Sequence, residues 1–326
     1  MKHANFLVVG GSGFVGRHLV AALAARGARV TVPTRRRDRA KHLILLPTVE
    51  VLEADVRDAQ VLARLAAGRD AVVNLAGVLH SRPASRAEQG PNHYGPDFAQ
   101  AHVELAQSVV NACRQAGTGY NRPRLLHMSA LGADPGAPSQ YLRSKGIGEQ
   151  AALAADDLAV TVFRPSVIFG PEDRFLNLFA QLTAWLPVLA LGSPRARFQP
   201  VYVGDVVTAL LAALESRESA GRRYDLCGPR ECTLQELIEF VCALTGRRRL
   251  ILGLPDSLSY LQAWMLELLP VQLLTRDNYH SMKVPNVCDC EFPFGIQPVA
   301  LEAAAAWLAP SGPRERYPRL RWRARR

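Results

Sequence analysis

The sequence contains no apolar stretch of about 18 residues that is free of charge or proline, so we expect no membrane-spanning helix. Residues 1–4 alone precede the first predicted strand, which argues against a signal peptide. No internal repeat is visible. We therefore expect a cytoplasmic protein, and 326 residues of which 48% are hydrophobic provide core for one large or two modest domains.

The six cysteines lack the patterns of a metal or redox site. They form no C-x-x-C pair, and no histidine stands at zinc-finger spacing from them. Cys288 and Cys290 are the only close pair. We expect reduced thiols in the core and no metal.

The net charge of +10 is concentrated in residues 313–326, which carry seven arginines and one glutamate. The sequence has no recognised nucleic-acid module and no basic stripe with interleaved aromatics, so we expect no nucleic-acid partner. Two interpretations of the tail stay open. It is either a solvated tail or a contact to an anionic membrane or respiratory complex, which would place the protein at the inner face of the membrane.

Strand and helix patterns alternate through the first half of the chain, which predicts an α/β fold with a Rossmann-type, doubly wound parallel sheet. Helices are expected at 59–67, 97–116 and 138–155. The expected strands are 6–9, 28–33, 49–53, 70–77, 124–129 and 159–163.

The second half predicts a smaller, mainly helical substrate-type domain. Helices are expected at 175–185, 205–214 and 234–244, the last capped by Thr233. Residues 250–274 form an amphipathic helix broken by prolines. We expect a dinucleotide-binding domain over 1–170, to which about 198–226 returns, a C-terminal region over 171–312, and the basic tail.

The chain is organised around a glycine-rich loop after the first strand. Gly10, Gly13 and Gly16 follow an apolar run and open a helical pattern that ends at Gly27. Such glycines allow a tight turn and a close approach of the backbone to a pyrophosphate, which binds at the helix N-terminus. This context predicts a dinucleotide site.

A second motif, Tyr141-x-x-x-Lys145, follows the fifth predicted strand. The spacing of four places both side chains on one helix face. A lysine beside a phenol stabilises the phenolate, so we expect Lys145 to lower the pKa of Tyr141. Ser129, at the end of that strand, would bind an oxygen of a small-molecule substrate.

These motifs resemble the short-chain dehydrogenase/reductase superfamily of the extended or atypical kind. Four blocks resemble the branch that holds the NAD(P)H-binding accessory subunit of mitochondrial complex I and its bacterial relatives. They are S-A-L-G-A-D-P (129–135), Y-L-R-S-K-x-x-G-E (141–149), R-P-S-V-I-F-G-P-E-D-R-F-L-N (164–177) and F-Q-P-V-Y-V-x-D-V (198–206).

The resemblance implies roles for individual positions. The pyrophosphate would be held by Gly10, Ser12, Gly13, Phe14, Val15 and Gly16. The adenine would face Asp55 and Val56, and the cofactor would be lined by Leu75, Ala76 and Gly77. The ribose and nicotinamide would contact Tyr141, Lys145, Pro165, Ser166 and Val167.

The sequence departs from the superfamily pattern at three places. Residues 34–37 read Thr-Arg-Arg-Arg where an NAD-specific protein usually has an acid, and Asp38 is the nearest one. Arg35 or Arg36 would pair with a 2′-phosphate, so NADP(H) is preferred and NAD(H) stays open. His102 stands where an enzyme commonly has Asn, and Ala130 follows Ser129.

These observations favour an NADP(H)-dependent oxidoreductase with Tyr141, Lys145 and Ser129 as its catalytic residues. Two alternatives stay open. One is a non-catalytic dinucleotide-binding accessory or assembly subunit of a complex I-like assembly. The other is a sugar-nucleotide epimerase or dehydratase, which the short interval between Ser129 and Tyr141 disfavours.

Overall fold

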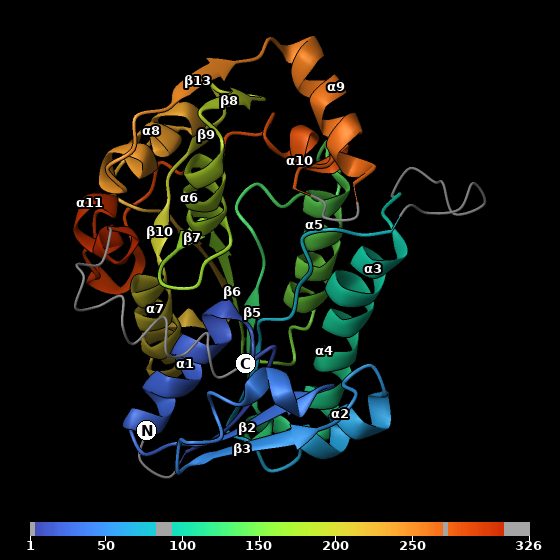
Figure 1. The fold of residues 1–326 in the computed structure, drawn as a ribbon. Coiled ribbons are helices and arrows are strands. Elements are labelled where there is room, and N and C mark those ends of the chain that lie inside the picture. The colour runs from blue at the N-terminus through green and yellow to red at the C-terminus, as the bar shows by residue number, and fades with distance from the viewer. Residues whose placement is uncertain (1–3, 83–92, 270–272, 310–326) are drawn as a thin grey trace.

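The computed structural model describes residues 4–82, 93–269 and 273–309 (Figure 1). Within these residues seven strands form one parallel sheet in the order β11-β6-β5-β4-β1-β2-β3. Their bounds are β1 (Asn5–Val9), β2 (Arg29–Thr34), β3 (Val49–Glu53), β4 (Ala71–Asn74), β5 (Arg124–Met128), β6 (Val160–Pro165) and β11 (Arg222–Leu226). The chain runs outward from β1 to β3 and returns with β4 on the other side of β1. This reversal is the switch point at which such sheets bind ligands.

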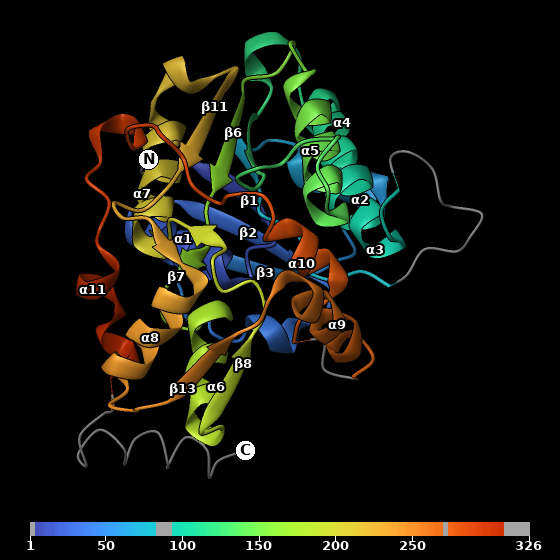
Figure 2. The ribbon, with the colours of Figure 1, turned by 90° about the horizontal axis from the view of Figure 1, so that it is seen from above.

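Helices cover both faces of the sheet, as the view from above shows (Figure 2). One face carries α1 (Phe14–Ala25) and α7 (Val203–Glu215), and the other carries α2 (Ala59–Ala66), α4 (Leu105–Gln115) and α5 (Gln140–Leu153). Alternate residues of β1 enter the two cores, because side chains alternate along a strand: Phe6 and Val8 pack with the first set, Leu7 and Val9 with the second. The predicted doubly wound fold is confirmed.

The predicted helix over 97–116 has a defect near its start. It consists of α3 (Pro96–Phe98), a π-helical turn (Ala99–Glu104) and α4. The π turn packs against α5 at Gly148, where a Cβ atom would overlap the carbonyl oxygen of His102. A π turn within an α-helix often marks a functional site, and this one carries His102.

The C-terminal half adds short strand pairs that the sequence did not predict. Its helices are α6 (Phe175–Trp185), α8 (Leu234–Leu244), α9 (Asp256–Glu267), α10 (Arg276–Ser281) and α11 (Leu301–Ala304). The pairs are β7 (Ile168–Phe169) with β10 (Val201–Tyr202), β9 (Arg197–Phe198) with β12 (Cys232–Thr233), and β8 (Val188–Leu191) with β13 (Leu250–Gly253). Short 3₁₀ turns lie at Arg37–Ala40, Gly119–Asn121, Arg217–Ser219, Pro293–Gly295 and Ala305–Leu308.

Several predictions for this half can be compared directly. Thr233 caps α8 in a capping box with Glu236, as its sequence pattern predicts. Residues 250–253 form a strand rather than the start of a broken helix. No helix in the described part of the chain combines the length and apolarity needed to cross a bilayer. The basic tail at 313–326 lies outside the described residues, so its role stays a prediction.

The contact between α5 and the π turn leads to a stability prediction. We expect Gly148→Ala to lower the free energy of unfolding by about 3 kcal/mol, the upper end of the range for overpacked sites, because the new methyl group meets backbone that cannot move aside. Gly246→Asn is the control, since Gly246 has positive φ after α8 and open space around it. Denaturant unfolding measures both. Equal stability of the two variants would contradict the close approach.

Candidate dinucleotide and catalytic site

The glycine loop lies against the end of β4 at the switch point. Gly10 has φ of +81°, and a Cβ atom there would lie 2.9 Å from the backbone of Leu75 and Ala76. A Cβ atom on Gly16 would overlap the carbonyl oxygen of Gly10. Only glycine fits both positions, because any side chain would force the loop away from β4 or from α1.

The N-terminus of α1 has the features of an anion site. The helix begins after Gly13, no side chain of the described residues caps its first N–H groups, and its first turn contains no acid. Ser12, Phe14 and Val15 lie on this loop and turn. Free N–H groups and the helix dipole favour a bound phosphate there, so these residues fit the pyrophosphate of a dinucleotide.

The end of β4 brings the glycine loop and α5 together. Leu75 N donates to the carbonyl oxygen of Val9 (2.9 Å), which continues the β1–β4 pairing. Two residues on, a Cβ atom on Gly77 would lie 3.2 Å from Lys145 Nζ and 3.4 Å from His102 Nε2. The predicted lining residues 75–77 thus connect the glycine loop with the Tyr-Lys helix.

The pKa of Tyr141 differs from our expectation. Lys145 Nζ donates to the carbonyl oxygen of Met128 (3.0 Å). Burial and, to a smaller extent, the Asp277 carboxylate raise the pKa of Tyr141 to about 12, while burial lowers the pKa of Lys145 to about 8. The prediction that Lys145 lowers the pKa of Tyr141 is wrong for this structure, and the phenol holds its proton at neutral pH.

Asp277 is a residue that the sequence did not single out. It lies on α10, and its carboxylate accepts hydrogen bonds from Gln140 N (2.6 Å) and Tyr141 N (3.1 Å). It therefore satisfies N–H groups of the first turn of α5 beside the cap made by Ser139 Oγ. No local sequence pattern identifies Asp277, because its contacts with Gln140 and Tyr141 join segments well over a hundred residues apart.

His102 is held as a neutral ring. Its Nε2 accepts from Val78 N (3.1 Å), and its Nδ1 lies 2.8 Å from Ser144 Oγ, which donates to the carbonyl oxygen of Tyr141 (2.8 Å). Burial and the nearby Lys145 ammonium lower the pKa of His102 well below its usual value. Because Nε2 accepts a hydrogen bond, Nδ1 carries the ring proton and donates a hydrogen bond to Ser144 Oγ. The ring therefore fixes the loop after β4 relative to α5.

Ser129 fits a substrate-binding role. It follows β5, and its N–H donates to the carbonyl oxygen of Phe163 (2.8 Å). Its hydroxyl is buried and has no hydrogen-bond partner among the described residues. An unpaired buried hydroxyl costs free energy unless a ligand supplies the partner.

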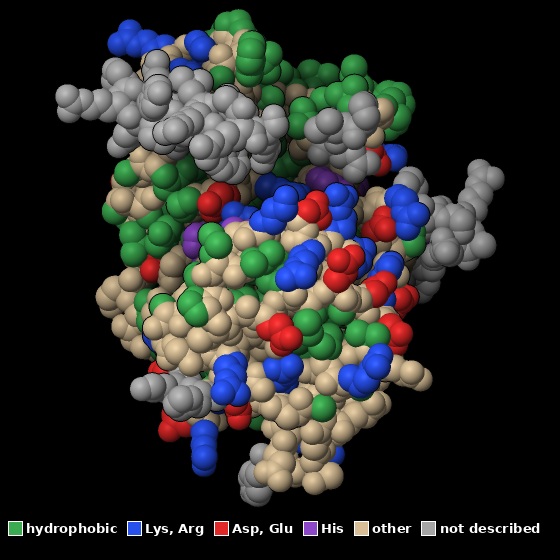
Figure 3. All heavy atoms as spheres, turned by 60° about the horizontal axis from the view of Figure 1, so that its bottom comes forward, with side chains coloured by type: hydrophobic (Ala, Val, Ile, Leu, Met, Phe, Trp, Pro, Cys, Tyr) green, Lys and Arg blue, Asp and Glu red, His purple; other side chains and the backbone are tan. Residues whose placement is uncertain are grey.

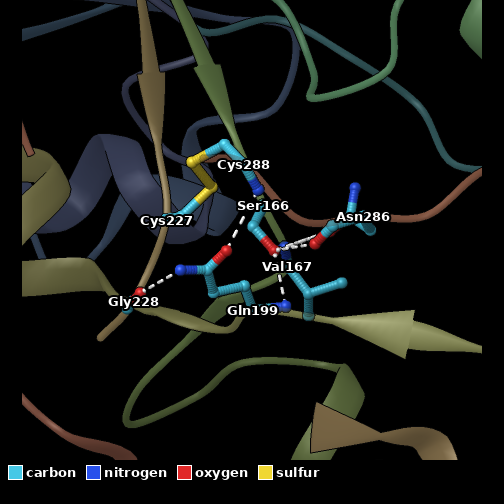
Figure 4. The surroundings of a disulfide bond; sticks show 7 residues. All are labelled: Ser166, Val167, Gln199, Cys227, Gly228, Asn286 and Cys288. Atoms are coloured by element: carbon cyan, nitrogen blue, oxygen red, sulfur yellow. Dashed lines mark hydrogen bonds between the residues drawn. A yellow bond between two sulfur atoms is a disulfide. The ribbon is translucent and has the colours of Figure 1, made fainter. Parts of the chain in front are cut away.

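The end of β6 is joined to a segment from the far end of the sequence (Figure 4). Strand β6 ends at Pro165. Asn286 then accepts two hydrogen bonds from Ser166 Oγ, one at its Oδ1 (2.6 Å) and one at its carbonyl oxygen (3.0 Å). Its Oδ1 also accepts from Val167 N (3.0 Å). Gln199 Nε2 donates to the carbonyl oxygen of Gly228 (2.7 Å). Of the predicted nicotinamide-side residues 165–167, Ser166 and Val167 are therefore held in place by Asn286.

Our expectation for the cysteines is wrong at two positions. Cys227, directly after β11, forms a disulfide with Cys288, two residues beyond Asn286 (Figure 4). The pairing brings together residues 61 apart in sequence, a separation at which spacing carries no signal. Among the described residues four cysteines are free: Cys113, Cys232 and Cys242 are buried, and Cys290 is exposed.

The ends of β2 and β3 form a charged group. Arg36 pairs with Asp38 (3.0 Å), and Arg35 is exposed beside it. Asp55 accepts from Arg57 through both oxygens (2.8 and 2.9 Å to Nε), and this hydrogen bonding lowers the pKa of Asp55 to about 2. Arg57 was missed by sequence reasoning, although it stands two residues from the predicted Asp55. Val56 packs into the core beside α2.

The fold and this site together define a dinucleotide-binding α/β protein. The chain belongs to the NAD dependent epimerase/dehydratase family, whose pattern matches residues 6–227. A mouse relative, "NADH dehydrogenase [ubiquinone] 1 alpha subcomplex subunit 9, mitochondrial", is 30% identical over 309 residues, which are 90% of this chain and 77% of that protein. The "Ceramide reductase" of Caulobacter vibrioides is 37% identical over 206 residues, 63% of this chain and 59% of that one.

Among solved structures, the fold is similar to that of DesIV, a dTDP-glucose 4,6-dehydratase from Streptomyces venezuelae with NAD bound. The TM-score is 0.67, the identity is 21%, and the similarity covers 93% of this chain and 95% of that one. The predicted resemblance to the extended short-chain dehydrogenases and to the complex I accessory subunit is confirmed.

The buried Lys145 predicts a specific pH dependence of stability. Its pKa is about 8 in the folded state against 10.5 unfolded, so between these values the unfolded chain binds more protons and folding becomes more favourable as pH rises. Between pH 8 and 10.5, the unfolding free energy of the wild type should therefore rise by up to about 3 kcal/mol relative to that of Lys145→Met, which lacks the titrating group. Urea unfolding of both proteins at each pH measures this. A constant difference would contradict a depressed pKa.

Proposed function

We propose that the chain is an NADP(H)-dependent oxidoreductase that reduces a carbonyl group of a small molecule. Ser129 would bind the carbonyl oxygen, Tyr141 would protonate it, and Lys145 would hold the cofactor ribose. The observation that carries the proposal is the buried Ser129 hydroxyl, which has no partner in the described part of the chain. It lies at the strand end whose Met128 carbonyl accepts from Lys145. The dinucleotide would supply the hydride when bound.

The raised pKa of Tyr141 keeps its phenol in the protonated form that carbonyl reduction requires. A phenol with a pKa of about 12 is protonated at neutral pH and is a proton donor. A bound carbonyl oxygen that gains negative charge would draw this proton, and Lys145, whose pKa is about 8, would then balance the phenolate. The residues thus support general acid catalysis by Tyr141.

The preference for NADP(H) rests on the end of β2. Arg35 is exposed and has no ion pair among the described residues, whereas Arg36 already pairs with Asp38. A 2′-phosphate would pair with Arg35 directly. It would pair with Arg36 by replacing Asp38, since a guanidinium binds two phosphate oxygens at once. NAD(H) would lack this contact and would bind more weakly.

One observation favours a second function, a non-catalytic dinucleotide-binding subunit of a respiratory assembly. His102 is neutral, and both of its nitrogens are used in fixing backbone and Ser144, so it offers no proton relay. The mouse relative is named as a subunit of NADH dehydrogenase. In this role the dinucleotide would stabilise the fold, and the basic residues 313–326 would contact the anionic membrane or the assembly.

The cofactor proposal predicts a difference between the two dinucleotides. Wild-type protein should bind NADPH about tenfold or more tightly than NADH, because one guanidinium–phosphate contact is worth about 1.5–3 kcal/mol. Arg35→Ala with Arg36→Ala should remove that difference and leave NADH affinity unchanged, and Arg217→Ala is the matched control. Calorimetric titration of each of the three apo proteins with each dinucleotide measures these affinities. Equal affinity of the wild type for both dinucleotides would refute the preference.

Tyr141→Phe distinguishes the enzyme from the structural subunit. If Tyr141 is the general acid, NADPH oxidation with a panel of carbonyl and quinone acceptors should fall about 10²–10⁴-fold in the variant. Its NADPH-dependent rise in melting temperature should persist, because the pyrophosphate contacts come from the glycine loop. Gly13→Val should lose that rise. Absence of turnover with every acceptor, with the melting shift retained, would instead support the structural role.

A further inference from the structure

Helix α9 buries two small side chains and exposes most of its large apolar ones. Ser259 and Ala263 are buried, and Ser259 Oγ accepts from Ser193 N (3.0 Å). Gln262 Nε2 donates to the carbonyl oxygen of Ala190 on β8 (2.8 Å). The helix is therefore held by its narrow polar and small-residue face. A helix at the surface of a water-soluble protein usually buries its apolar face instead.

The outer face of α9 is a continuous apolar surface. Spacings of three and four residues align exposed side chains along the helix. They are Leu258 (47%), Leu261 (47%), Trp264 (44%) and Met265 (57%), and Leu268 (70%), directly after Glu267, continues the row. The acids of α9 lie away from this row: Asp256 pairs with Lys283 (3.5 Å) and Glu267 with Arg276 (2.8 Å).

The neighbouring strand pair extends the apolar surface. In the β8–β13 register Val188 lies beside Leu250 and Ala190 beside Leu252. Val188, Leu250 and Leu252 are 45%, 58% and 48% exposed, and Trp185, at the end of α6 just before β8, is 87% exposed. We call the exposed row of α9 with these four large side chains the apolar face. So large an exposed apolar surface marks an interaction site.

A basic border adjoins the apolar face. Residues 247–249 are three consecutive arginines directly before β13. Arg247 and Arg249 donate to carbonyl oxygens of α6 at Ala180 (3.0 Å) and Thr183 (2.7 Å), and Arg248 is exposed. Figure 3 shows hydrophobic side chains gathered at this end of the molecule, with Lys and Arg side chains at one corner. The border complements an anionic partner.

We propose that the apolar face docks on an anionic lipid bilayer. Leucine and methionine side chains of α9 would enter the acyl boundary, as in amphipathic helices that lie in the membrane plane. Trp185 and Trp264 combine an apolar ring with an N–H donor, which suits the headgroup level. Arg247, Arg248 and Arg249 would meet the lipid phosphates. A water-soluble partner would not require this combination of protruding aliphatic chains and a cationic border.

Vesicle co-sedimentation of the full-length chain tests the proposal. The wild type should bind vesicles of phosphatidylcholine mixed equally with phosphatidylglycerol, and bind pure phosphatidylcholine more weakly. Leu261→Glu with Met265→Glu should lower the partition coefficient at least about tenfold, and Arg248→Glu about fivefold. The controls are Arg217→Glu and Leu45→Glu, whose leucine is 86% exposed. Leu45 belongs to the segment between β2 and β3, and Figure 1 shows these strands at the end of the molecule opposite α9.

The same experiment distinguishes a bilayer from the other possible partners of the apolar face. Partition of the double variant within about threefold of the wild type would overturn the proposal, because the basic tail alone would then explain binding. A wild type that ignores the mixed vesicles but forms dimers, which the double variant abolishes in light scattering, would also overturn it in favour of a second copy. Melting temperature verifies that each variant is folded. If the double variant does not fold, Trp185→Ser replaces it, and an unchanged partition would again refute the docking.

Discussion

The close approach of the glycine loop to the end of β4 is the constraint on which the site depends. Gly10 leaves no room for a side chain against Leu75 and Ala76, and Gly16 none against Gly10. This contact directs the N-terminus of α1 toward the switch point, where its first N–H groups would bind phosphates in the proposed site. It also brings Gly77 beside Lys145. The packing of the glycine loop against β4 therefore positions both the proposed pyrophosphate site and the Tyr-Lys helix.

Burial decides the protonation states at these strand ends. Tyr141 keeps its proton, Lys145 titrates near pH 8, and His102 is neutral, in each case chiefly because a low dielectric disfavours charge. The buried hydroxyl of Ser129 has no hydrogen-bond partner within residues 4–82, 93–269 and 273–309. In the proposed enzyme, Tyr141 would give its proton to a substrate oxygen that gains charge, and a ligand that hydrogen-bonds the Ser129 hydroxyl would bind more tightly.

The C-terminal half acts on this site from one side and presents an apolar surface on the other. Asp277 on α10 binds the first turn of α5, and Asn286 with the Cys227–Cys288 disulfide holds the end of β6. Helix α10 packs against α9, where the rings of Tyr260 and Tyr279 lie 5.4 Å apart. The outer face of α9 faces away from these contacts, so one short segment links the proposed membrane surface to the Tyr-Lys helix.

The sequence by itself determined the local features: the glycine loop, the Tyr-Lys spacing and the Thr233 cap, because glycine conformation, helical periodicity and capping act within a few residues. It also determined the doubly wound class through the alternation of strands and helices. Only the tertiary structure decided the raised pKa of Tyr141, its neighbour Asp277 and the Cys227–Cys288 pairing. These depend on burial and on contacts between distant segments, and no local pattern encodes either.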